Sequence, residues 1–198
     1  MNPTNRSSSE SFDRLVKLLI FLFLVLPIVV LSFSTNRHVA SIEENLHYRE
    51  PSSRDDARRE IEALPWHPVQ GQTLYVPAYS HIYQNDGEPR LLTVTLSARN
   101  TDRQSEIVLT SVDYHDTSGK LLRAFLDKPL RLGPLASTEF LIKQKDKSGG
   151  SGASFLVHWQ AGVPVTPPVV ESVMIDTSNQ QGISFARPAS VLDEDVRP

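Results

Sequence analysis

Two alternating segments lie near the middle of the sequence: Leu91-Leu-Thr-Val-Thr-Leu-Ser-Ala-Arg99 and Glu106-Ile-Val-Leu-Thr-Ser-Val-Asp-Tyr-His115. In the first, apolar residues at every second position alternate with polar ones, which is typical of a strand with one buried and one solvated face. In the second, the same period predicts that Val108, Val112 and Tyr114 share one face. The two segments therefore predict a pair of antiparallel strands at the centre of a β-domain.

Turn residues bound these strands and recur along the chain. Asn100-Thr101-Asp102 has side chains that stabilise turns, and Gly119 supplies the positive φ that a hairpin loop needs. Further strand-like segments follow the same pattern, at residues 73–79, 121–126, 130–132, 137–143, 155–159, 169–176 and 183–185. Short strands without helices between them predict an all-β domain over residues 73–188, an antiparallel β-sandwich of immunoglobulin-like type. An acidic, flexible tail is expected over residues 189–198.

Composition excludes several classes of protein. The chain has 198 residues with a net charge of −3, so it lacks the clustered basic surface that binds nucleic acid. It contains no cysteine, which excludes disulfides, a thiolate nucleophile and a cysteine-ligated metal. The length suffices for one domain with additional segments.

The N-terminal region contains an apolar run over residues 18–31, extended by Phe33. As a helix, residues 18–33 would be about 24 Å long, and adding Leu15 and Val16 brings it to about 28 Å, close to the ~30 Å of a hydrocarbon core. We therefore expect a cytoplasmic tail at 1–14 and a transmembrane signal-anchor at 15–34. The alternative is a cleaved signal peptide, because Ser32-Phe33-Ser34 is a small-x-small site.

Flanking charge predicts the orientation of this segment. Arg6, Arg14 and Lys17 precede the apolar run, and Arg37 alone follows it closely. The positive-inside rule then places the N-terminus in the cytoplasm. The expected location is the inner membrane, with a single span and the C-terminal domain in the periplasm or otherwise extracytoplasmic. A juxtamembrane linker with a short helix near residues 54–64 is expected over 35–72.

Several blocks in order resemble one protein family: Tyr75-Val-Pro-Ala-Tyr-Ser-His-Ile-Tyr83, Leu96-Ser-Ala-Arg-Asn-Thr-Asp102, Val112-Asp-Tyr-His-Asp-Thr-Ser-Gly-Lys120, Leu132-Gly-Pro-Leu-Ala-Ser-Thr-Glu-Phe140, Ser148-Gly-Gly-Ser-Gly-Ala-Ser-Phe155 and Gln181-Gly-Ile-Ser-Phe185. Together they cover roughly residues 74–185. The family is an uncharacterised bacterial one, known as a domain of unknown function. The resemblance implies an exported or membrane-tethered domain and transfers no catalytic residue.

The candidate binding residues are Tyr79, His81, Tyr83 and His115. Pro77 cannot donate to a β-ladder, so the strand that carries it is expected at a sheet edge. Period two then places Tyr79, His81 and Tyr83 on one face as a polar-aromatic stripe suited to a ligand or partner, although packing at the strand edge is an alternative. His115 belongs to the polar cluster Asp113-Tyr-His-Asp116, which is expected to cap a hairpin rather than to bind a metal.

Three functions fit the sequence. The first is a membrane-tethered, extracytoplasmic β-sandwich that binds a protein or envelope component. The alternatives are a metal-assisted or other hydrolytic enzyme and a structural subunit of an envelope assembly. No catalytic residue, metal site or cofactor is predicted; Gly149-Gly-Ser-Gly-Ala153 lacks the glycine that a nucleophile elbow carries two residues after its serine.

Overall fold

The computed structural model describes residues 14–26, 28–29, 31, 48, 68–178 and 181–194. The chain divides into two compact units, Met1–Tyr48 and Arg49–Pro198. In the first unit, residues 14–26 are helical. Among the described residues, no helix combines the length and the apolar content that a membrane crossing requires. The predicted signal-peptide cleavage site and juxtamembrane helix lie outside the described residues.

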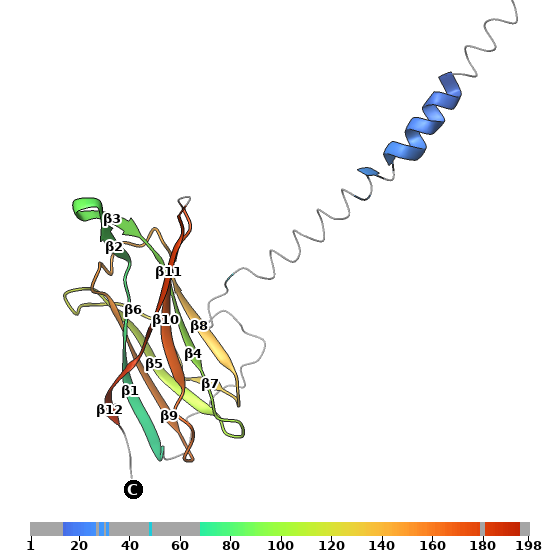
Figure 1. The fold of residues 1–198 in the computed structure, drawn as a ribbon. Helices are drawn as coiled ribbons and strands as arrows, with labels where there is room; N and C mark the ends of the chain where they lie inside the picture. Colours follow the sequence, from blue (N-terminus) through green and yellow to red (C-terminus); the bar gives the residue numbers. More distant parts are fainter. Residues whose placement is uncertain are drawn as a thin grey trace, which may run out of the picture. The chain divides into compact units, whose positions relative to one another are not determined.

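The second unit consists of antiparallel sheets (Figure 1). The first sheet has the order β12-β1-β9-β5-β6, with β7 also paired to β5. Its strands are β1 (Gln70–Pro77), β5 (Ile107–His115), β6 (Leu121–Ala124), β7 (Leu130–Leu132), β9 (Ser154–Ala161) and β12 (Ser190–Glu194). The second sheet has the order β11-β10-β4-β8. Its strands are β4 (Thr93–Arg99), β8 (Ser137–Ile142), β10 (Val169–Asp176) and β11 (Ile183–Pro188).

The two sheets share one hydrophobic core. Residues of both sheets are fully buried in it, among them Val94, Leu96, Val112, Phe140, Phe155, Val157 and Trp159. Phe140 of β8 packs edge-on against Phe125, with ring centroids 5.4 Å apart, and Phe125 lies 6.1 Å from Phe155 of β9. These aromatic contacts join the two sheets, and each is worth about 0.5–1.5 kcal/mol beyond its buried area. The prediction of an antiparallel all-β domain is confirmed.

A bulge in β5 makes it wrong that Val108 shares a face of the strand with Val112 and Tyr114. Along the pairing with β9, Leu109 lies opposite Trp159 and Ser111 opposite His158, so that Thr110 is an extra residue. An inserted residue shifts the alternation by one position. Val112 and Tyr114 therefore face the core, whereas Val108, although buried, lies outside the core cluster.

The predicted tail also requires correction. Residues 190–194 form β12, which pairs with β1 through Gln72, Thr73, Leu74 and Tyr75. The charge of Asp193 and Glu194 indicated a solvated tail, but main-chain pairing with β1 holds residues 190–194 in a strand. Residues 195–198 lie outside the described part of the chain.

The loops gather at two ends of the domain. The hairpin end holds a two-stranded sheet of β2 (His81–Gln84) and β3 (Glu88–Leu91), joined by the 3₁₀ turn η3 (Asn85–Gly87). The turn after β10 lies at the same end, and the last residue of β12 lies at the other (Figure 1). We call the second end the Asn100 end, because this residue follows β4 there.

Asn100 and Asp102, in the turn predicted at residues 100–102, hold the loops of the Asn100 end together by hydrogen bonds. The buried Asn100 amide donates to the carbonyls of Ser105, Leu132 and Gly133, at 2.8, 3.1 and 2.9 Å. Asp102 accepts main-chain N–H groups from Gln104, Ser105 and Thr166. These hydrogen bonds, led by the one from Gln104, hold the pKa of the Asp102 carboxyl below its usual value. Three loops are thereby tied together.

Candidate functional site

The β2–β3 hairpin carries the part of the predicted site that is most exposed. Its turn needs left-handed backbone, with φ of 39° at Asn85, 60° at Asp86 and 111° at Gly87. Asn, Asp and Gly tolerate this region best, which explains why the turn forms at these residues. The hairpin is paired with neither of the two larger sheets through β2 or β3.

His81 and Tyr83 lie together on β2, as the period of two predicted. Their ring centroids are 5.1 Å apart and the rings are nearly perpendicular, at 82°. The Tyr83 side chain is 63% exposed and His81 is half-buried. This edge-to-face pair presents an aromatic and an imidazole surface to solvent.

Tyr79 does not belong to this pair, contrary to the predicted three-residue stripe. β1 ends at Pro77 and β2 begins at His81, so Tyr79 lies between strands. Its ring packs edge-on against the ring of Phe185 in β11, with ring centroids 5.8 Å apart. The guanidinium carbon of Arg187 lies 5.6 Å from the centroid of the Phe185 ring. Tyr79 thus packs against the core, which was the alternative reading of this residue.

The prediction that Pro77 lies on an edge strand is wrong. β1 is flanked by β9 on one side and by β12 on the other. The nitrogen of the next residue, Ala78, donates to Ala153 on the β9 side at 2.8 Å. Because main-chain groups of successive residues point to opposite sides of a strand, the Pro77 nitrogen points away from β9. On that side β12 ends its pairing at Tyr75, so Pro77 deprives no neighbour of a hydrogen bond.

His115 lies apart from the hairpin. It is the last residue of β5, half-buried, and opposite Ser154 of β9 and Leu121 of β6. Within the described residues, no hydrogen bond, ion pair or ring contact joins His115 to His81 or Tyr83. The structure therefore supports a two-residue surface rather than the four-residue site of the sequence.

The polar cluster around His115 caps a hairpin as predicted. Asp116 accepts hydrogen bonds from the main-chain N–H and hydroxyl of Ser118 and from the N–H of Lys120. These donors, led by the Ser118 hydroxyl, hold the pKa of the Asp116 carboxyl below its usual value. Among the described residues, no group of three or more histidine or acidic side chains is arranged to hold a metal ion.

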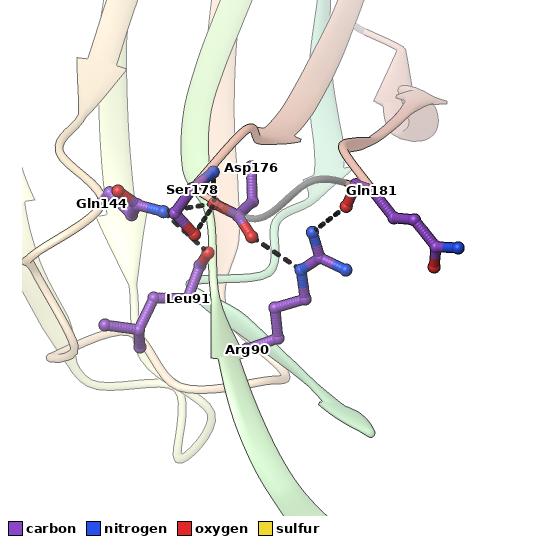
Figure 2. A network of polar contacts seen from close by, with 6 residues as sticks. All are labelled: Arg90, Leu91, Gln144, Asp176, Ser178 and Gln181. Atoms are coloured by element: carbon purple, nitrogen blue, oxygen red, sulfur yellow. Dashed lines mark hydrogen bonds and ion pairs between the residues drawn. The ribbon is translucent and has the colours of Figure 1, made fainter. Parts of the chain in front are cut away.

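A buried ion pair fixes the hairpin to the rest of the domain (Figure 2). Arg90 of β3 donates through Nε to Asp176 at 2.6 Å and through Nη2 to the carbonyl of Gln181 at 2.6 Å. Gln144 donates to the other carboxylate oxygen at 2.7 Å and to the Leu91 carbonyl at 3.2 Å. β3, the loop after β8 and the turn after β10 therefore meet at one carboxylate.

Asp176 is only 2% exposed and its charge is fully compensated. Ser178 donates to it through both its main-chain N–H and its hydroxyl, at 2.9 and 2.6 Å. The Ser178 hydroxyl foremost, then its N–H and Arg90, hold the pKa of the Asp176 carboxyl far below its usual value. The carboxylate is thus ionised at neutral pH and clamps the hairpin electrostatically.

Sequence reasoning missed this clamp, although one signal was present. Asp-x-Ser occurs at Asp116, Asp146 and Asp176, and in each case the serine two residues later donates its N–H and hydroxyl to the aspartate. The motif marks a turn at the hairpin end each time. Nothing local marks Arg90 as a partner, because it is 86 residues from Asp176 in sequence.

The glycine-rich loop after β8 packs against the same end of the domain. A Cβ at Gly149 would lie 2.7 Å from Cζ of Tyr114 and 2.8 Å from the Ala153 Cβ, so the position has no room for a side chain. The Gly149 carbonyl accepts from the N–H of Thr117 at 2.9 Å. Burial raises the pKa of the Tyr114 hydroxyl, which lies 3.2 Å from the buried Ser80 hydroxyl. The loop therefore packs closely against Tyr114 and Thr117.

Comparisons with known proteins give a family and one structural likeness. A family model described as "Protein of unknown function (DUF3124)" matches residues 71–192. No curated protein matches the chain. A solved structure titled "Crystal Structure of Thermotoga maritima 1070" is similar over 60% of this chain and 92% of that chain, at 11% identity and a TM-score of 0.35.

Proposed function

This chain belongs to the DUF3124 family of proteins of unknown function, and on that premise we propose that it is a membrane-tethered binding module. Its β-domain, which we propose to be an immunoglobulin-like sandwich, would lie outside the cytoplasm and hold a protein or another envelope component. The observation that carries the proposal is the His81–Tyr83 pair, with Tyr83 exposed and His81 half-buried, on a hairpin clamped by a buried ion pair.

The clamp makes this pair suitable for recognition. A two-stranded hairpin is marginally stable alone, so an unattached hairpin would lose much conformational entropy on binding a partner. Arg90 bonds directly to Asp176 at the end of core strand β10 and to the carbonyl of Gln181, and so removes that freedom before a partner arrives. Tyr83 then offers a large amphipathic ring with few rotatable bonds, which favours its use at protein interfaces.

The tether is supported by the sequence of the N-terminal region. The apolar run over residues 18–31 follows Arg6, Arg14 and Lys17, which is the charge pattern of a segment whose N-terminus stays in the cytoplasm. A single inner-membrane span with the β-domain in the periplasm is the proposed arrangement. A tethered domain meets membrane-bound partners at a high effective concentration, so even modest affinity at the hairpin would suffice.

Site-directed photo-crosslinking in the full-length chain tests the binding surface. A photoreactive residue at the exposed position Glu88, beside the pair, should form an adduct of one defined mass in the native membrane. The combined His81→Ala and Tyr83→Ala substitutions should abolish that adduct while the melting temperature stays near that of the wild type. The same photoreactive residue at Arg103, at the Asn100 end, is the matched control.

Two outcomes would contradict the proposal. One is an adduct that is the same from Glu88 and Arg103, since it would reflect proximity rather than recognition. The other is loss of folding in the double variant, which would show that His81 and Tyr83 contribute packing instead of a contact surface.

A further inference from the structure

β12 is an outer strand with an unusual degree of exposure. All five of its residues, Ser190–Glu194, are exposed, including Val191 at 49% and Leu192 at 54%. Successive side chains point to opposite faces of a strand, so apolar surface is exposed on both faces of this edge. The strand is held by its pairing with β1 and by a hydrogen bond of 3.5 Å between the side chains of Gln72 and Glu194.

One side of β12 offers main-chain groups for a further strand. Within the described residues, β12 pairs with β1 alone and forms the end of the six-stranded sheet. Its pairing shifts between Thr73 and Leu74, so Leu192 has no partner in the register with β1. Unpaired N–H and C=O groups along a sheet edge are a template for strand addition.

Two other outer strands of the larger sheets, β6 and β11, are better protected. β6 has four residues and includes Arg123, whose guanidinium lies 4.4 Å from the Phe125 ring centroid. β11 contains Arg187 and ends with Pro188, which cannot donate to a ladder. Short length, charge and proline are the usual devices that block edge pairing. β12 instead has two adjacent exposed apolar residues.

The charge of β12 indicates what kind of strand could be added. The strand carries Asp193 and Glu194 and no basic residue. A second copy of the chain would double this negative charge along the new ladder, whereas a segment rich in lysine or arginine would neutralise it. Opposite charges across a strand pair stabilise it and like charges destabilise it.

We propose that β12 accepts an extended, basic segment of a partner protein as an additional strand of the six-stranded sheet. Main-chain hydrogen bonds would supply affinity, Val191 and Leu192 would contact apolar residues on the two faces, and the acidic residues would select basic side chains. This site is separate from the His81–Tyr83 surface and does not depend on it.

A fluorescent peptide of alternating lysine and valine residues is the probe. It is titrated into the full-length chain in detergent micelles and followed by anisotropy. We expect saturable binding that weakens by at least about tenfold in the Asp193→Lys/Glu194→Lys variant, because charge pairing is lost. The control variant Asp86→Lys/Glu88→Lys makes the same change of charge on the hairpin and should bind as the wild type does. A second variant, Leu192→Pro, removes a main-chain donor at a residue without a β1 partner and should also weaken binding.

Two altered peptides show whether a strand is formed. A peptide with an N-methyl group on every residue has no N–H group to donate to β12 and should not bind; a peptide with glutamate in place of lysine should bind at least about tenfold more weakly. Absence of binding, equal binding of either altered peptide, or equal loss in the two charge variants overturns the proposal. So does self-association of the chain through β12, measured by light scattering, since the occupant would then be a second copy.

Discussion

At the scale of single residues, Asp176 couples the stability of the hairpin end to pH. Hydrogen bonds from Ser178 and the Arg90 charge hold the pKa of this carboxyl far below its usual value in the folded state. A depressed pKa means that the folded chain binds fewer protons than the unfolded chain at acidic pH. The stabilisation is therefore complete above the unfolded pKa of about 3.9 and is lost as the pH falls through the folded pKa.

The Asp176→Asn variant should reveal this coupling. It keeps the shape of the side chain but removes its charge, so we expect a lower free energy of unfolding at pH 7 and a smaller further loss below about pH 4 than in the wild type. Urea titrations at several pH values measure both. Asp86→Asn, at an exposed turn position, is the matched control. Parallel pH profiles for wild type and Asp176→Asn would contradict this account.

Leu135 shows strain at the other end of the domain. It has a φ of 57° and is 67% exposed, in a turn where its N–H donates to the Asp102 carbonyl at 3.1 Å. Left-handed backbone costs a leucine roughly 1–2 kcal/mol, which the locked loops of the Asn100 end impose.

Leu135→Asn should therefore raise stability by about 0.5–1 kcal/mol, because asparagine tolerates this backbone region better. The comparison is Leu121→Asn, at a leucine of similar exposure (51%) in strand β6, where no gain is expected. Thermal denaturation measures both variants. Equal changes in melting temperature at the two positions would mean that the polarity of asparagine, not relief of backbone strain, causes the effect.

At the scale of elements, alternation predicted the strands that lie over the core. Leu96 of β4 and Phe140 of β8 lie opposite each other in the register and are fully buried. Replacing either by alanine empties a packed site, so we expect a loss of about 2–5 kcal/mol for each in urea unfolding. A loss below about 1 kcal/mol for both would mean that the assigned strand faces are wrong.

Where the structure differs from the predicted one, each difference has an identifiable physical cause. A bulge such as the one at Thr110 leaves no mark in composition, yet it reverses the face on which Val108 lies. The pairing of β12 depends on main-chain groups of β1 more than a hundred residues away, which no periodicity of Ser190–Glu194 can show. Tyr79 fitted the stripe by spacing, but the strand break before His81 rotates it towards Phe185. Of the candidate site, sequence predicted the His81–Tyr83 pair and missed its clamp.

At the scale of the whole molecule, the orientation of the chain in a membrane is testable. A reporter that is active only outside the cytoplasm, fused after Pro198, should be active because three basic residues precede the apolar run. Deleting residues 18–31 should abolish its activity. Activity of a cytoplasm-specific reporter at the same position would refute export, and the mass of the mature chain separates an anchor from a cleaved signal peptide.

The pairing of β1 with β12 also has a consequence for the timing of folding. Gln72 and Glu194 meet across 122 residues, so the first strand of the domain lacks one of its two neighbours until β12 has been synthesised. Closing so long a loop is slow, and contacts of high sequence separation delay folding. A nascent chain emerging N-terminus first would keep one side of β1 uncovered until Glu194 has been synthesised. Any chaperone that attends this protein would be needed during that interval, and a stalled chain ending before residue 190 would remain open.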